Sequence, residues 1–374
     1  MNAAQFLETV ASLSLQAAIV IVAAGCIRRF GRLTAQAECR LWTCSHAVIL
    51  TLTAIAATFP HLRLVIPEPL AAARAVSTVQ TQLIAGRVLQ AVWLTGVAVA
   101  GMSLVGGWIC AARCLQSCRP IADDLVVSSG VAKVAAIGGR SVQFQTGPHV
   151  AGPCCWQFHR PYILLPNAVL GFPAGERQFI VQHELAHLRL GHPLQLFLQR
   201  LVEILYWFHP IVWWSARQAA LAREFACDAA VVSSRSEIAG YLRTLLSVVE
   251  QTQSVGEPCR ETIGFGVGSG VIALRARRLV TLAQSGDIGV ESWIGRRLRP
   301  AAILLCGVAC TLAWLPVNDL ASSRSWLSPW PTWSAALARD FRVPARDYEA
   351  YDPRTQLFEL RETAVEEEAA TASR

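Results

Sequence analysis

Residues 5–26 read QFLETVASLSLQAAIVIVAAGC, and Glu8 is the only charged side chain in this stretch. A transmembrane helix needs about 20 consecutive, mainly apolar residues to cross the hydrocarbon core of a bilayer. Three further runs of this character occupy residues 42–60, 89–112 and 300–317. The sequence therefore predicts four transmembrane helices and a lipid bilayer as the surrounding medium.

The composition of the whole chain supports a membrane protein. Hydrophobic residues make up 53% of the sequence and charged residues 16%, and the mean hydropathy is +0.39. Soluble domains typically contain about 25% charged residues. The net charge of +7 is carried almost entirely by arginine, because Lys133 is the only lysine. No basic stripe alternates with aromatic residues, so we expect no direct binding of nucleic acid.

The cysteines predict reduced thiols. The twelve cysteines contain no CxxC pair of the kind that holds a zinc ribbon. Most of them lie in or beside the apolar runs or in the central region. This distribution favours cytosolic or membrane-buried thiols over a disulfide framework.

Arginine clusters orient the predicted helices. Loops rich in lysine and arginine stay in the cytoplasm. The loop after the first run is arginine-rich, the third run is followed by two arginines, and the fourth is preceded by three; the residues are Arg28, Arg29, Arg32, Arg40, Arg113, Arg119, Arg296, Arg297 and Arg299. All three clusters fall on one side if the chain crosses the membrane at each run. We therefore expect an inner-membrane protein with residues 113–299 in the cytoplasm and both termini outside.

This orientation divides the chain into four parts. We expect three transmembrane helices with short loops, a cytoplasmic domain, a fourth transmembrane helix, and a short, partly disordered extracytoplasmic tail; these parts cover residues 1–118, 119–298, 299–317 and 318–374. Residues 251–270, with five glycines and a proline, predict a flexible connection within the cytoplasmic domain.

Residues 179–193, FIVQHELAHLRLGHP, contain the pattern HExxH. On a helix, His183 and His187 project from one face about one turn apart, which suits two imidazole nitrogens binding one Zn²⁺. Glu184 would then lie beside the metal and accept a proton from its bound water. The alternative is an amphipathic core helix that binds nothing. His192 follows at i+5 from His187, off the ligand face, and is expected to be an exposed residue at the helix end.

A third ligand is available downstream. A catalytic zinc site needs three protein ligands and one open position. Residues 221–232, LAREFACDAAVV, offer Glu224 and Asp228 four residues apart on a helix-forming stretch. Glu224 can complete a His₂Glu site, and Asp228 can hold the outer N–H of a ligating histidine. The alternative for Glu224 is a solvated helix charge.

The stretch between these two motifs predicts a reversal of the chain. Residues 201–214 read LVEILYWFHPIVWW, and Pro210 disfavours a helical conformation at His209. The second helix can then return beside the first. The aromatic residues suit a turn at the membrane interface, and a buried hairpin is the alternative.

Upstream of HExxH, residues 160–166 read RPYILLP. Prolines at both ends favour an edge strand, with which a peptide substrate could pair. A structural strand that covers the helices is the alternative.

Four of these segments, RPYILLP, QHELAHLRLGHP, FHPIVWW and REFACDAAVV, resemble in order and spacing the membrane-embedded zinc metallopeptidases of the BlaR/MecR type, which are β-lactam sensor-transducers and antirepressors. The resemblance covers roughly residues 1–317. It implies a mainly α membrane protein with a cytoplasmic α+β gluzincin-like domain inserted between helices three and four. It also implies Zn²⁺ as cofactor, His183, His187 and Glu224 as its ligands, and Glu184 as general base.

Some features depart from that family. Sensor members carry a large penicillin-binding domain after the last helix, whereas about 57 residues follow Val317 here and contain no SxxK motif. A β-lactam-sensing role is therefore not expected. In addition, His192 stands where an acidic residue is usual, and a glycine usual before the proline of the predicted strand is missing.

We therefore expect a zinc metalloendopeptidase that hydrolyses peptide bonds of a cytoplasmic protein in regulated signalling. By analogy with the family, the substrate would be a transcriptional repressor or the protein itself. The alternative is a zinc-binding transmembrane scaffold that transmits a signal without proteolytic turnover. The sequence assigns no substrate-binding residues.

Overall fold

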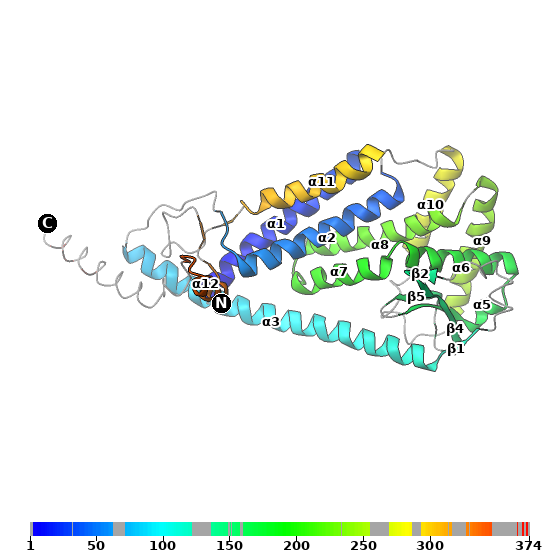
Figure 1. Ribbon diagram of the computed structural model, residues 1–374, viewed down its shortest axis with the longest axis horizontal. Helices are drawn as coiled ribbons and strands as arrows, with labels where there is room; N and C mark the ends of the chain where they lie inside the picture. Colours follow the sequence, from blue (N-terminus) through cyan, green and yellow to red (C-terminus); the bar gives the residue numbers. More distant parts are fainter. Residues whose placement is uncertain are drawn as a thin grey trace.

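The molecule is elongated in a computed structural model: its sheet lies towards one end of the long axis, and a long apolar helix runs along that axis to the sheet (Figure 1). The structure describes residues 3–31, 33–62, 72–121, 136–148, 150, 152–157, 160–232, 234–254, 269–285, 293–312, 314–315, 327–328 and 330–345, together with 365, 369 and 372.

Among the residues that the structure describes, three helices are long and apolar enough to cross a membrane: α1 (Ala3–Phe30), α2 (Ala35–Thr58) and α3 (Ala72–Ser117). Thr34 caps α2, because its hydroxyl oxygen accepts a hydrogen bond from the backbone N–H of Ala37. These helices correspond to the first three predicted spans.

The fourth predicted span falls on α11 (Trp293–Cys310), which packs against α1 and α2 (Figure 1). Its apolar part, Pro300–Cys310, is shorter than a membrane crossing within the residues that the structure describes. A fourth crossing therefore stays a prediction.

The predicted reversal at His209–Pro210 is confirmed. Helix α7 (His192–Leu205) ends before it, and α8 (Pro210–Val231) returns beside α7 and against α6 (Ala174–Arg189).

The α7–α8 hairpin lies alongside the apolar helices. The hydroxyl groups of Tyr206 and Thr53 of α2 are 2.7 Å apart, and Trp93 of α3 donates its indole N–H to the carbonyl of Leu205 at 2.9 Å. A side chain at Gly96 would collide with the ring of Trp207, so the glycine permits this close approach.

The turn of the hairpin has a buried part and an exposed aromatic part, so it has features of both alternatives, a buried hairpin and a turn at the membrane interface. Tyr206 is buried, whereas Phe208, Trp213 and Trp214 are about 40% exposed. Trp213 also donates its indole N–H to the carbonyl of Trp207 at 2.8 Å. Buried packing and outward-facing aromatic rings therefore occur in the same turn.

The sheet has four strands in the order β1-β4-β6-β5, namely β1 (Arg119–Pro120), β4 (Gln143–Gly147), β6 (Pro161–Pro166) and β5 (Cys154–Gln157). β4 and β6 are parallel, and the other pairs are antiparallel. A separate hairpin joins β2 (Ala136–Ile137) to β3 (Arg140–Ser141) through two glycines with positive φ.

The prediction that residues 160–166 form an edge strand is wrong. β6 lies between β4 and β5 and pairs with both. Its prolines occupy the two ends of the strand, where a missing N–H does not interrupt the ladder. Between them, Ile163 and Leu165 pack with Val181 and Leu185 of α6 in a core between sheet and helix. β5 is the terminal strand on this side of the sheet.

Two helices follow the hairpin, α9 (Arg235–Ser254) and α10 (Ser269–Ser285). The connection predicted to be flexible lies largely outside the described residues. A short helix α5 (Asn167–Leu170) joins β6 to α6.

Part of the tail predicted to be partly disordered packs against the end of α2. It contains α12 (Thr332–Asp340), and Trp333 donates its indole N–H to the carbonyl of Ala57 at 2.8 Å. His61 and Ser328 are joined by two hydrogen bonds of 2.8 Å each. Most of the polar end of the tail, residues 361–374, lies outside the described residues.

Candidate metal centre

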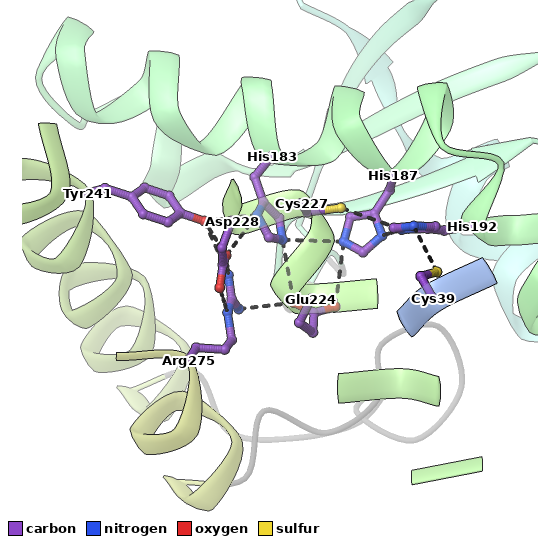
Figure 2. Close-up of polar contacts among 9 residues, drawn as sticks. All are labelled: Cys39, His183, His187, His192, Glu224, Cys227, Asp228, Tyr241 and Arg275. Atoms are coloured by element: carbon purple, nitrogen blue, oxygen red, sulfur yellow. Dashed lines mark hydrogen bonds and ion pairs between the residues drawn. The ribbon is translucent and has the colours of Figure 1, made fainter. Parts of the chain in front are cut away.

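The two motifs meet where α6 packs against α8 (Figure 2). The four-residue spacing places His183 and His187 on the face of α6 that meets α8, from which Glu224 and Asp228 project. The structure thus brings all four of these predicted side chains together, and their roles are proposed below.

Three side chains present donor atoms at the separation that a single zinc ion requires. The Nε2 atoms of His183 and His187 are 3.3 Å apart. One carboxylate oxygen of Glu224 lies 3.4 Å from Nε2 of His183, and the other lies 3.5 Å from Nε2 of His187. In a tetrahedron with zinc–ligand bonds of about 2.0–2.1 Å, two ligand atoms are about 3.3 Å apart. The donor set therefore fits Zn²⁺ in chemistry and in spacing.

The outer nitrogen of His183 is held by a tyrosine that the sequence analysis missed. The hydroxyl of Tyr241 lies 2.9 Å from His183 Nδ1 and donates its proton to Asp228 at 2.7 Å. The tyrosine oxygen must then accept a hydrogen bond from Nδ1–H, so the Nε2 lone pair of His183 is free to bind a metal. Asp228 itself is 3.4 Å from His183 Nδ1. Tyr241 lies on α9, and no spacing pattern in the sequence relates it to either motif.

Arg275 of α10, a second residue that the sequence patterns do not indicate, neutralises the carboxylates of Asp228 and Glu224. It donates two hydrogen bonds to Asp228, at 2.9 and 2.6 Å, and its guanidinium lies 3.0 Å from Glu224. Burial by itself raises the pKa of Glu224, but Arg275 and the two histidines outweigh it and hold that pKa well below its usual range. Glu224 is therefore an anion, as a metal ligand should be.

Glu184 is buried next to this group. Burial raises the pKa of Glu184 to about 7; the charge of Glu224 adds to the rise, and His183 and Arg275 oppose it. A carboxyl group with a pKa near neutrality can both accept and return a proton at physiological pH.

A cysteine competes with Glu224 for the third ligand position. One ligand atom from each of His183, His187 and Cys227 lies within 4.8 Å of the others. Burial raises the pKa of the Cys227 thiol, and the charges of Glu224 and Glu184 raise it further. In the metal-free site the Cys227 thiol therefore keeps its proton, whereas Glu224 is already an anion and needs to lose no proton to serve as a third ligand.

The prediction that His192 is exposed is wrong. The side chain is 3% exposed, and its Nδ1 lies 2.9 Å from Nδ1 of His187. Gly191 adopts a left-handed conformation with φ of 70°, so the chain turns between α6 and α7 and His192 begins a new helix. Counting positions along one continuous helix therefore misplaces it. Burial lowers the pKa of His192 to about 2, so its ring is neutral.

Comparison with known proteins gives two matches. The family model described as BlaR1 peptidase M56 matches residues 8–265, a range that holds both motifs and Tyr241 but ends before Arg275. The protein named Regulatory protein BlaR1 from Bacillus licheniformis is 33% identical over 95 residues, which are 25% of this chain. The matched region spans 16% of the length of that relative.

Proposed function

The chain belongs to the BlaR1 peptidase M56 family of membrane-associated metallopeptidases, and we propose that it is a zinc-dependent endopeptidase. Its metal ligands would be His183, His187 and Glu224. The observation that carries this proposal is the close approach of three side chains. The two imidazole Nε2 atoms are 3.3 Å apart, one carboxylate oxygen of Glu224 lies 3.4 Å from Nε2 of His183, and the other oxygen lies 3.5 Å from Nε2 of His187. These distances are close to the spacing of neighbouring ligand atoms around one tetrahedral zinc ion.

Glu184 supplies the acid–base chemistry in this proposal. Zinc, when bound, lowers the pKa of its water towards 7 and polarises the carbonyl group of the scissile peptide bond. The Glu184 carboxylate accepts the proton that the attacking water loses and returns it to the nitrogen of the leaving amine. Tyr241 keeps the Nδ1 proton on His183 throughout, so Nε2 remains a ligand atom.

The terminal strand β5 offers a route for an extended substrate in place of β6. β5 packs against α6, which carries Glu184. Burial and the charges of Glu184 and Glu224 raise the pKa of the thiol of Cys155 in β5, because the strand runs beside the metal centre. A peptide that added to the outer side of β5 would pass close to Glu184.

The arginine clusters support a cytoplasmic site and a cytoplasmic substrate. Cys39, near the N-terminal end of α2, lies 3.6 Å from His192, so the metal centre sits beside the end of α2 that follows the arginine-rich loop. Arginine-rich loops of inner-membrane proteins stay on the cytoplasmic side of the membrane. By analogy with the family, the substrate is a transcriptional repressor or the protein itself.

The full-length protein, purified in detergent, provides the test. We expect one zinc ion per chain by elemental analysis, and cleavage of a quenched-fluorescent peptide library. His183→Ala should lose the metal. Glu184→Gln should keep the metal and lose cleavage by about 10²–10⁴-fold. Undiminished cleavage by Glu184→Gln would rule out the mechanism, and normal signalling by that variant in cells would favour the zinc-binding scaffold.

A further inference from the structure

A chain of hydrogen bonds leads from His187 away from the metal position to the membrane helix α2 (Figure 2). Nδ1 of His187 lies 2.9 Å from Nδ1 of His192. Nε2 of His192 lies 3.6 Å from the sulfur of Cys39, near the N-terminal end of α2. The Cys39 thiol in turn donates to the side-chain carbonyl of Gln195 at 2.9 Å, and the amide group of Gln195 donates to the carbonyl of Leu190 at 2.9 Å.

The donors and acceptors along this chain agree in direction. If Nε2 of neutral His187 binds a metal, its proton must be on Nδ1, and Nδ1 of His192 must accept that proton. His192 then carries its own proton on Nε2, from which it donates to the sulfur of Cys39. The thiol proton of Cys39 is free to go to Gln195. One assignment therefore satisfies every member, and it is the assignment that leaves His187 Nε2 open to the metal.

Burial makes this arrangement rigid. His192 and Cys39 are 3% and 4% exposed, so water does not compete for their hydrogen bonds. The sulfur of Cys227 lies 3.5 Å from Nδ1 of His192 and contacts the ring from α8. The His192 ring is thus held between α2 and α8 while it contacts the ring of His187.

We propose that His192 and Cys39 are positioning residues for the metal ligand His187, so that a membrane helix supplies part of the outer support of the metal centre. This inference rests on the proposed metal site. Partners that hold the outer N–H of a ligating histidine fix its tautomer and orientation, and their loss typically lowers metal affinity 10–100-fold.

Metal affinity of the full-length chain in detergent tests the proposal without reference to cleavage. Competition for zinc against a chromophoric chelator should show that His192→Ala weakens binding by about 10–100-fold. His192→Asn should restore most of the affinity, because its side-chain oxygen can take the place of Nδ1 as acceptor. Cys39→Ala should weaken binding by a smaller factor. Cys44→Ala, on the same helix, is the matched control and should leave the affinity unchanged.

Cobalt substitution separates positioning from a general loss of structure. With saturating Co²⁺, the d–d absorption bands of His192→Ala should differ from those of the wild type, and those of His192→Asn and Cys44→Ala should not. Wild-type affinity and an unchanged spectrum in His192→Ala would overturn the proposal. A sulfur-to-cobalt charge-transfer band that Cys39→Ala abolishes would also overturn it, because Cys39 would then be a ligand.

The same measurements distinguish this proposal from the proposed function. A wild-type chain that binds no zinc would remove the basis of both. A wild-type chain that binds zinc but cleaves nothing would remove the endopeptidase activity alone, and the comparison of His192→Ala with His192→Asn would still decide the role of His192.

Discussion

Replacing Arg275 with methionine should destabilise the metal-free protein more than any surface change on the same helix. The side chains of Arg275 and Asp228 are 7% and 3% exposed, and that of Glu224 is 27% exposed. Methionine fills a similar volume but leaves both carboxylates without their cation. Breaking a buried ion pair by removing one partner costs about 3–5 kcal/mol.

Thermal unfolding of the full-length chain in detergent, with metal removed by chelation, measures this loss. A change of 1 kcal/mol moves the midpoint of a 150–250-residue domain by about 2–4 °C, so the expected fall is about 6–20 °C. Zinc should reduce the difference from the wild type, because a bound cation also compensates the charge of Glu224.

Two further variants make the result decisive. In Arg275→Met with Asp228→Asn, the buried carboxylate of Asp228 is gone, so part of the lost stability should return. Arg277→Met alters an exposed arginine of the same helix and should change the stability by less than about 0.5 kcal/mol. If Arg275→Met unfolds at the same temperature as Arg277→Met, the reasoning about buried charge is refuted.

Three other predictions concern single side chains outside this ion pair. Tyr241→Phe should weaken zinc binding by about 10–100-fold in a chelator competition, because His183 loses its acceptor; wild-type affinity would contradict this. Glu38→Gln should lower the free energy of unfolding by about 1–3 kcal/mol, because Arg28 loses the partner of its ion pair and Arg278, 3.5 Å from Glu38, loses an anionic neighbour; an unchanged thermal midpoint would count against it. Burial lowers the pKa of His61 to about 4, so the unfolded chain binds the proton more readily between pH 6.5 and 4. As the pH falls through that window, the free energy of unfolding of the wild type should therefore fall by up to about 3 kcal/mol relative to that of His61→Phe. Above pH 7, the difference between the thermal midpoints of the two proteins should stay constant.

The parts of the metal centre that a single helix determines could be predicted from the sequence. Four-residue spacing places His183 with His187, and Glu224 with Asp228, whatever the rest of the fold does. The reversal at Pro210 then brings the two helices together. Local backbone geometry was sufficient for these predictions, because each depends on residues that are close in the chain.

The remaining parts depend on contacts between distant elements. Tyr241 and Arg275 reach Asp228 from α9 and α10, and only tertiary packing brings those helices to the site. His192 was misplaced because a single left-handed residue, Gly191, ends one helix and begins another. The position of β6 within the sheet was wrong because prolines at strand ends do not reveal how many neighbours the strand has.

The indole groups that cap the α7–α8 turn have a consequence for the order in which the protein assembles. A carbonyl group that is buried without a donor is costly, and the carbonyl of Leu205 takes its donor from Trp93 of α3. The ribosome makes α3 before α7, so the donor is already present when the hairpin emerges. Glu224 arrives on the second helix of that hairpin. If Glu224 is the third metal ligand, as proposed, that ligand becomes available to the nascent chain only after α1, α2 and α3 have been made, and metal uptake would then report that the hairpin has formed.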